Sequence, residues 1–159
     1  LSTLHTNDAP SAVTRLLDIG VEPFLLHSTV LGIMAQRLVR TLCPHCRETG
    51  SIDDEAWKSL TAPYQMPKPT NAFVAKGCLE CRMTGYMGRV GIYEMMTLSP
   101  AQRRLISAET DLNKVREQAM RDGMKPLRVS GALKVAAGMT TVEEVMKVAP
   151  PASGERRAV

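Results

Sequence analysis

Four cysteines in two pairs are the residues whose type and spacing most clearly predict chemistry. They are the only cysteines among 159 residues, and they form the motifs Cys43-Pro-His-Cys46 and Cys78-Leu-Glu-Cys81. Two residues between cysteines let both thiolates of a pair reach one ion through a tight turn, so two pairs can supply four tetrahedral ligands. Because four thiolates leave no coordination position for water, the sequence predicts a structural Zn²⁺ rather than a catalytic one.

Other uses of the same cysteines compete with zinc. Two disulfides would require an oxidising compartment, a single iron ion has the same ligand set, and a redox motif would need only one pair. His45 lies inside the first pair and could replace a thiolate. Because four thiolates are available, we interpret His45 as an exposed residue of the turn, and His27 as a structural histidine.

His5 is the third histidine, and it lies in the stretch STLHTND. Residues 1–4 alternate apolar and polar side chains like the end of a strand. In α/β proteins the loops at the carboxyl ends of strands carry groups that contact ligands. His5 is therefore a candidate functional residue, and the alternative is a strand-end residue that only holds the turn through Thr6 or Asn7.

Apolar periodicity and turn residues predict the elements that position these groups. The patterns favour a helix from Pro10 to Gly20, a second from Pro23 to Met34, and strands over 37–42 and 88–96 that pair with each other. Between the cysteine pairs they indicate a helix within 51–60, a proline-rich loop and a short strand near 71–77. Four short helices are expected between Ser99 and residue 149, and a disordered tail after them.

Composition sets limits on the class of protein. Apolar residues make up 44% of the chain, which suits one or two compact units, and 20 basic against 16 acidic residues give a net charge of +4. The basic residues are scattered, which indicates a mildly basic surface. No signal peptide and no run of about 18 apolar residues occurs, so we expect no membrane span and a reducing cytoplasm. The missing initial methionine suggests a C-terminal fragment.

Several longer stretches together resemble one protein family. LSTLHTNDA, RLLDIGVEPFLL, GIMAQRLVRTLCPHC, CRMTGYMGRVGIYE and VAAGMTTVEEVMKV closely resemble, over residues 1–148, the C-terminal part of the ATPases of type II secretion systems and type IV pilus assembly. STLHTNDA is similar to the end of that family's histidine box, and the cysteine pairs to its tetracysteine zinc element. The resemblance implies a RecA-like α/β fold, a homo-hexamer, and a cytoplasmic location at the inner membrane beside secretion or pilus platform proteins.

This resemblance also implies a domain organisation. Residues 1–42 would end a RecA-like ATPase domain, 43–88 would be an inserted tetracysteine zinc lobe, 89–149 a closing strand with a C-terminal helical bundle, and 150–159 a disordered tail. Loss of the metal would loosen residues 43–89 and leave the C-terminal helices folded. Around Ser130-Gly131 the resemblance leads us to expect an acidic residue before the glycine, and the sequence lacks it.

The same resemblance implies a catalytic role for His5 in an intact parent that binds ATP and Mg²⁺, where the histidine would act near the γ-phosphate. The phosphate-binding motif G-x-x-x-x-G-K-[ST] is absent from the 159 residues, so we expect no ATP hydrolysis by this chain alone. Two alternatives are a zinc-ribbon module that binds nucleic acid and a purely structural scaffold fragment. Aromatic residues form only 4% of the chain, too few for a surface on which bases stack, so we expect no nucleic-acid partner.

Overall fold

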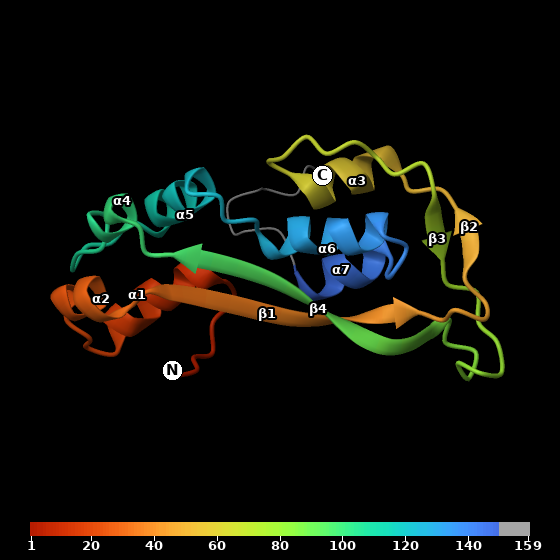
Figure 1. Ribbon diagram of the computed structural model, residues 1–159, viewed down its shortest axis with the longest axis horizontal. Coiled ribbons are helices and arrows are strands. Elements are labelled where there is room, and N and C mark those ends of the chain that lie inside the picture. Colours follow the sequence, from red (N-terminus) through yellow and green to blue (C-terminus); the bar gives the residue numbers. More distant parts are fainter. Residues whose placement is uncertain (150–159) are drawn as a thin grey trace. The chain divides into compact units, whose positions relative to one another are not determined.

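The structure is a computed structural model that describes residues 1–149. Helices and strands are mixed along the chain (Figure 1), as predicted for an α/β protein. The helices are α1 (Ala9–Asp18), α2 (Pro23–Thr29), α3 (Asp54–Thr61), α4 (Pro100–Arg103), α5 (Leu112–Arg121), α6 (Leu127–Ala136) and α7 (Val142–Val148). The strands are β1 (Gly32–Leu42), β2 (Glu48–Gly50), β3 (Ala72–Val74) and β4 (Tyr86–Thr97). The predicted disordered tail at 150–159 lies outside the described residues.

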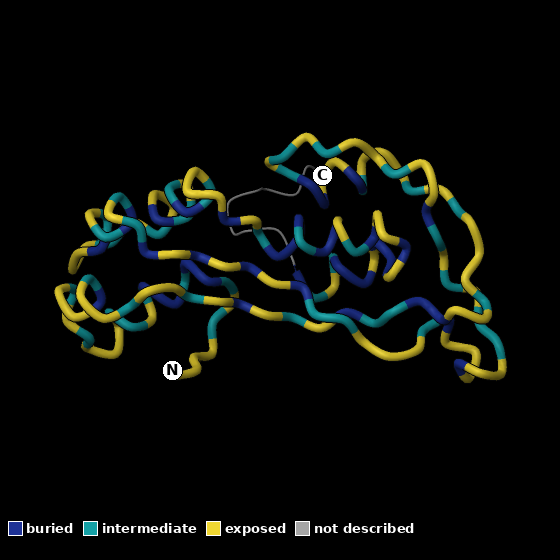
Figure 2. Tube along the Cα trace, in the orientation of Figure 1, coloured by how far each residue is buried: buried dark blue, intermediate teal, exposed yellow. Residues whose placement is uncertain are grey.

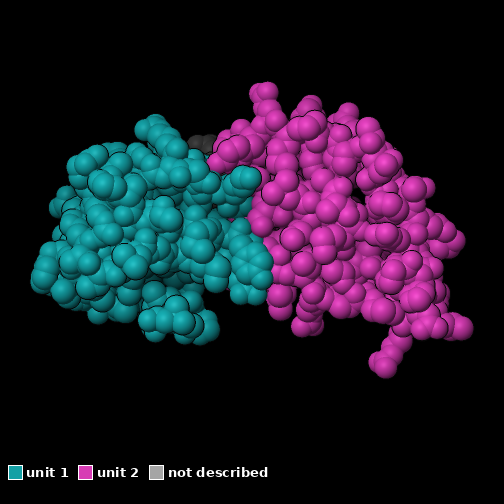
Figure 3. All heavy atoms as spheres, viewed as in Figure 1, with its two compact units in different colours: residues 1–36, 93–126 teal, residues 37–92, 127–159 magenta. Residues whose placement is uncertain are grey.

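Two compact units divide the chain (Figure 3). The first unit combines residues 1–36 with 93–126, and the second combines, among the described residues, 37–92 with 127–149. Each unit is therefore built from two separate stretches of sequence. Within residues 1–149, no helix has both the length and the apolar character needed to cross a bilayer.

Helix α1 begins within one residue of its predicted start. Asp8 precedes α1, and its carboxylate accepts the backbone N–H of Ser11 at 2.8 Å, while Pro10 occupies the first turn. After α1 the chain turns at Gly20, whose φ of +90° favours glycine. Asp111 caps α5 in the same way. The buried core of this unit includes Val13, Met96, Ile106, Val115 and Ala119, each exposed by 3% or less.

The prediction that the second helix extends to Met34 is wrong. Helix α2 ends at Thr29, Val30 already has an extended backbone with ψ of 120°, and β1 begins at Gly32. The carbonyl of Leu31 accepts the backbone N–H of Leu98 at 3.0 Å, at the point where β4 approaches. Pairing with a distant strand thus overrides the helical spacing of the apolar side chains, and Met34 is 55% exposed.

Strands β1 and β4 pair with each other, as the sequence predicts. Their arrows point in opposite directions in Figure 1, so the pair is antiparallel. Buried and exposed residues alternate over much of both strands (Figure 2), with Val39 and Ile92 fully buried. The shorter strands β2 and β3 also pair antiparallel, with Thr49 opposite Phe73. Strand β2 was not predicted.

Residues 1–6 have no regular secondary structure, so the predicted strand end at residues 1–4 is not formed. A strand requires a hydrogen-bonded partner. In the sheets formed by residues 1–149, β1 pairs with β4 and β2 with β3, and neither sheet includes this segment. His5 therefore lies in a segment without regular secondary structure, four residues before α1.

The second unit packs α3, α6 and α7 around a buried arginine. Trp57 and Leu60 are the buried apolar side chains of α3. Arg128 is only 6% exposed, and its guanidinium donates to the carbonyls of Ser59 at 2.8 Å and Ala149 at 3.2 Å. These two bonds tie the end of the described chain to α3.

Helices α6 and α7 approach each other closely at Gly131. A Cβ atom at this position would lie 2.2 Å from Cγ1 of Val145, which is too close for a side chain other than hydrogen. All four predicted C-terminal helices are present, but they do not form the single bundle expected from the sequence. Within the described residues, α4 and α5 belong to the first unit and α6 and α7 to the second.

Candidate metal centre

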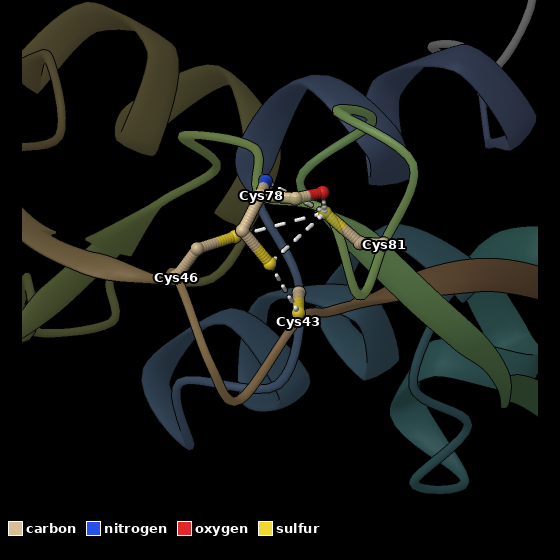
Figure 4. A group of neighbouring side chains, drawn as sticks. All are labelled: Cys43, Cys46, Cys78 and Cys81. Atoms are coloured by element: carbon tan, nitrogen blue, oxygen red, sulfur yellow. Dashed lines mark hydrogen bonds between the residues drawn. The ribbon is translucent and has the colours of Figure 1, made fainter.

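The four predicted cysteine ligands come together in the second unit. Figure 4 shows their side chains converging from two separate loops. Their sulfur atoms all lie within 4.8 Å of one another. Individual Sγ–Sγ distances are 3.9 Å for Cys43 and Cys78, 3.8 Å for Cys46 and Cys81, and 3.7 Å for Cys78 and Cys81. All four cysteines are free of disulfides.

These sulfur separations fit the edges of a tetrahedron around one metal ion. With metal–sulfur bonds of about 2.3 Å, as in zinc sites, the edge of a regular tetrahedron is about 3.8 Å. A disulfide would require two sulfurs at about 2.0 Å. The donor set and its spacing therefore suit a closed four-thiolate site for a divalent metal. A tetrahedral iron ion uses the same ligand set.

Cys43 and Cys46 belong to the first knuckle, which we define as residues 43–47. Cys43 directly follows β1 and is fully buried. Its carbonyl accepts the backbone N–H of Arg47 at 3.0 Å, which closes a tight turn. The N–H of Cys43 in turn donates to the carbonyl of Gly85 at 2.9 Å and joins the two knuckles.

The second knuckle, residues 77–85, depends on glycine at both ends. Gly77 has φ of +112° and Gly85 has φ of +77°. A Cβ at Gly77 would lie 2.8 Å from the carbonyl oxygen of Met83, and one at Gly85 would lie 2.6 Å from the Cβ of Ala75. The chain can therefore bend tightly enough to bring Cys78 and Cys81 to one point.

Backbone N–H groups surround the sulfur of Cys81. Burial would raise the pKa of this thiol, but the N–H groups of Cys78 and Gly85, each 3.2 Å from Sγ, outweigh it and lower the pKa to about 6. For Cys46, burial raises the pKa to about 12, with contributions from the neighbouring thiols, although the N–H of Gly77 opposes the rise. Backbone N–H groups directed at sulfur favour the thiolate form that a metal ion binds.

The turn between α6 and α7, residues 137–141, contacts the chain on both sides of the first cysteine pair. We call this segment the α6–α7 turn. Three hydrogen bonds make the contact: Leu42 N–H to Met139 O at 2.8 Å, Thr140 hydroxyl to Arg40 O at 2.8 Å, and Arg47 Nη1 to Gly138 O at 2.9 Å. The guanidinium of Arg47 also lies over the ring of Phe73, 4.6 Å from its centroid.

A second set of contacts joins β1 to α7. The guanidinium of Arg40 donates to both carboxylate oxygens of Glu144, at 2.5 and 2.8 Å, and lies 4.1 Å from the ring centroid of Tyr86. Lys147 donates to the same carboxylate at 3.0 Å. Hydrogen bonding from Arg40 is the main cause that lowers the pKa of Glu144 to about 2. The metal knuckles and α6–α7 are therefore packed as one structure.

The three histidines have different surroundings. His45 is exposed, as the sequence predicts. His27 donates through Nε2 to the carbonyl of Ile106 at 2.9 Å, which agrees with its interpretation as a structural residue. His5 is exposed in the first unit, four residues before α1. Its catalytic role stays a prediction.

Sequence reasoning missed the residues that hold the segment after His5. Glu94 is 4% exposed in β4, and its Oε1 accepts the backbone N–H of Ala9 at 2.8 Å. Arg116 of α5 pairs with Asp8 at 2.7 Å. The sequence did carry a signal for Glu94: it lies two residues from both Ile92 and Met96, so all three side chains fall on the same, buried face of the strand.

Comparison with known proteins identifies similar sequences along almost the whole chain. The family model described as "Type II/IV secretion system protein" matches residues 1–147. The chain is 51% identical over 150 residues to the type IV pilus assembly ATPase TfpB of Acinetobacter baylyi. It is 46% identical over 151 residues to the type II secretion system protein HxcR of Pseudomonas aeruginosa, and 44% identical over 148 residues to the type II secretion system ATPase E of Vibrio cholerae.

Each of these alignments covers most of this chain and a minor part of the relative. The shares of this chain are 94%, 93% and 93%, and the corresponding shares of the relatives are 26%, 28% and 29%. The chain therefore spans between a quarter and a third of the length of these relatives.

Proposed function

The chain belongs to the type II/IV secretion system protein family, and we propose that it is a metal-stabilised segment of an ATPase that powers type II secretion or type IV pilus assembly. One observation carries this proposal: the family match extends over residues 1–147 and so includes His5 and all four cysteines. Relatives named for secretion and for pilus assembly match at 44% to 51% identity, so the proposal covers both systems.

The metal in this proposal is a structural Zn²⁺ held by Cys43, Cys46, Cys78 and Cys81. The four sulfurs are spaced as a tetrahedron requires, and closed four-thiolate sites are typical of structural zinc. When bound, the ion supplies a cross-link between two knuckles that are far apart in sequence. The chain's own residues provide the turns, the N–H groups directed at sulfur, and the packing against the α6–α7 turn.

ATP hydrolysis in this proposal belongs to a longer protein that contains a phosphate-binding loop, with ATP and Mg²⁺ as its nucleotide and metal. His5 would act there as a hydrogen-bond donor to a phosphate oxygen, and the bond would strengthen as charge develops in the transition state. Its exposed position on the segment that leads into α1 is compatible with contact to a ligand.

The proposed assembly and location of the protein also rest on its family membership. We propose a RecA-like domain ending at residue 42, an inserted metal lobe over 43–88 and a closing region over 89–149, in a subunit of a homo-hexamer. The hexamer would lie in the cytoplasm at the inner membrane, in contact with secretion or pilus platform proteins. Hydrolysis in the hexamer would be converted into movement of those partners.

Steady-state ATP hydrolysis by the longer protein tests this function. We expect His5→Ala to lower kcat about 10-fold or more while nucleotide binding stays within a few-fold, since each factor of ten in rate corresponds to about 1.4 kcal/mol of transition-state stabilisation. His45→Ala changes another exposed histidine and serves as the matched control. Measurable hydrolysis by the 159-residue chain alone, or an unchanged rate in His5→Ala, would contradict the proposal.

A further inference from the structure

Two contacts from distant parts of the sequence hold the start of α1, which begins four residues after His5. The first comes from β4, where the buried carboxylate of Glu94 accepts the N–H of Ala9 at 2.8 Å. The second comes from α5, where Arg116 donates to Asp8 at 2.7 Å, and the two side chains are only 15% and 19% exposed. The beginning of α1 is therefore fixed by both a strand and a helix of the same unit.

Asp8 is paired with a cation at this helix start. Burial would raise the pKa of the Asp8 carboxyl, but hydrogen bonds from Ser11 and Arg116 outweigh it and hold the pKa below its ordinary value. Asp8 is therefore ionised at neutral pH, and it can keep both its capping bond to the N–H of Ser11 and its pair with Arg116.

The same contacts close the N-terminus of α1 to other ligands. The N–H of Ala9 is taken by Glu94, Pro10 has no N–H, and the N–H of Ser11 is taken by Asp8. A helix start often binds phosphate through such N–H groups. Here carboxylates occupy them, so the segment presents the side chain of His5 rather than the helix end.

His5 is close enough in sequence to the fixed start of α1 for these contacts to limit its position. Asp8 lies three positions after His5 along the chain, a reach of at most about 11 Å even when fully extended. Losing the Arg116 pair would release the segment from α5 and widen the range of positions that His5 samples. A displacement of about 1 Å at a reacting centre can cost about 100-fold in rate.

We propose that Glu94 and Arg116 are positioning residues for His5, because they fix Ala9 and Asp8 and thereby the place from which His5 acts on ATP. This inference rests on the role proposed above for His5. It assigns to β4 and α5 a part in catalysis, although neither residue contacts the reacting atoms in this account.

A double-mutant cycle in the longer protein tests the inference. Arg116→Ala should lower kcat about 10-fold and leave KM for ATP within about threefold, because it displaces a group that acts in the transition state. In the His5→Ala background the same change should lower kcat less than about twofold, since the histidine that it positions is absent. A purely structural role predicts the same fractional loss in both backgrounds and would overturn the inference.

Two further variants separate positioning from misfolding. Arg121→Ala removes an exposed arginine from the same helix, whose pair with Glu117 spans 3.9 Å, and should retain the rate of the unmodified protein. Asp8→Asn keeps a good capping residue while it removes the charge that Arg116 binds, so it should fold normally and lower kcat. Full activity of folded Asp8→Asn would count against the inference.

The failure of the proposed function would look different. If the unmodified longer protein does not hydrolyse ATP, or if His5→Ala alone has no effect on kcat, the proposed function or the role of His5 fails before Arg116 is considered. If His5→Ala lowers kcat and Arg116→Ala does not, only the positioning role is overturned.

Discussion

Loss of the metal is expected to loosen α6 and α7 together with the two knuckles. The sequence alone suggested that only residues 43–89 would respond. The structure changes this expectation, because the α6–α7 turn is hydrogen-bonded to β1 just before Cys43 and to Arg47 just after Cys46. A first knuckle that becomes mobile would release this turn as well.

The size of the effect follows from the contacts. Three hydrogen bonds join the α6–α7 turn to the flanks of the first cysteine pair, and at about 1 kcal/mol each they contribute about 3 kcal/mol. At 1.4 kcal/mol per factor of ten, their loss would raise the local opening equilibrium of α6 and α7 about 100-fold. By analogy with a disulfide that closes a loop of about 30 residues, closure by the metal contributes a further 3 to 4 kcal/mol, an upper estimate, to residues 43–81.

Amide hydrogen exchange on the 159-residue chain measures this effect. Exchange in Cys78→Ser should accelerate about 100-fold in α6 and α7, while α1 and α5 of the first unit keep their protection. His45→Ala alters the same lobe without removing a sulfur and should exchange like the unmodified chain. If α6 and α7 keep full protection while residues 43–89 lose theirs, the coupling that we derive from the turn is wrong.

Two other perturbations test the packing of the second unit. Arg40 lowers the pKa of Glu144 to about 2, so the pair stabilises the fold above the ordinary carboxyl pKa near 4.5. This contribution, roughly 1 to 3 kcal/mol, is lost as pH falls from about 5 to 2. The free energy of unfolding of Glu144→Gln, measured with denaturant, should lack this part of the acid dependence. Gly131→Ala should lower stability by about 1 to 3 kcal/mol in thermal unfolding, because its Cβ would meet Val145, whereas Leu133→Ala on the exposed face of α6 should change little.

The convergence of the four cysteines could be predicted from the sequence because its signal is local. Two cysteines separated by two residues specify a knuckle wherever they occur, and four thiolates have few other uses in a reducing compartment. Helix caps have an equally local signal: Asp8, Ser99 and Asp111 each precede a helix, and their side chains accept first-turn N–H groups.

The boundary between α2 and β1 was predicted wrongly because it depends on a contact between distant parts of the chain. Ile33 and Met34 fit both a helical stripe and a strand, and pairing with β4, about 60 residues later in the chain, decides between them. The same limit applies to the helices after Ser99, which looked like one bundle. Their division between two units depends on which distant segment each helix packs against, and apolar spacing does not encode this.

For the segment around His5, one prediction from the sequence is confirmed and another is wrong. The sequence placed His5 before a capped helix, which the structure confirms, and predicted a strand before it, which is wrong within residues 1–149. The contacts from Glu94 and Arg116 could not be predicted, because they join residues about 85 and 108 positions apart.

X-ray absorption at the zinc edge on the purified, reduced chain would measure the number, type and distance of the metal ligands. We expect one zinc ion per chain with a single shell of four sulfur ligands at about 2.3 Å, from Cys43, Cys46, Cys78 and Cys81. A nitrogen ligand in the shell would mean that a histidine such as His45 takes the place of one thiolate. That result, or a folded and reduced chain without metal, would contradict the four-thiolate zinc site.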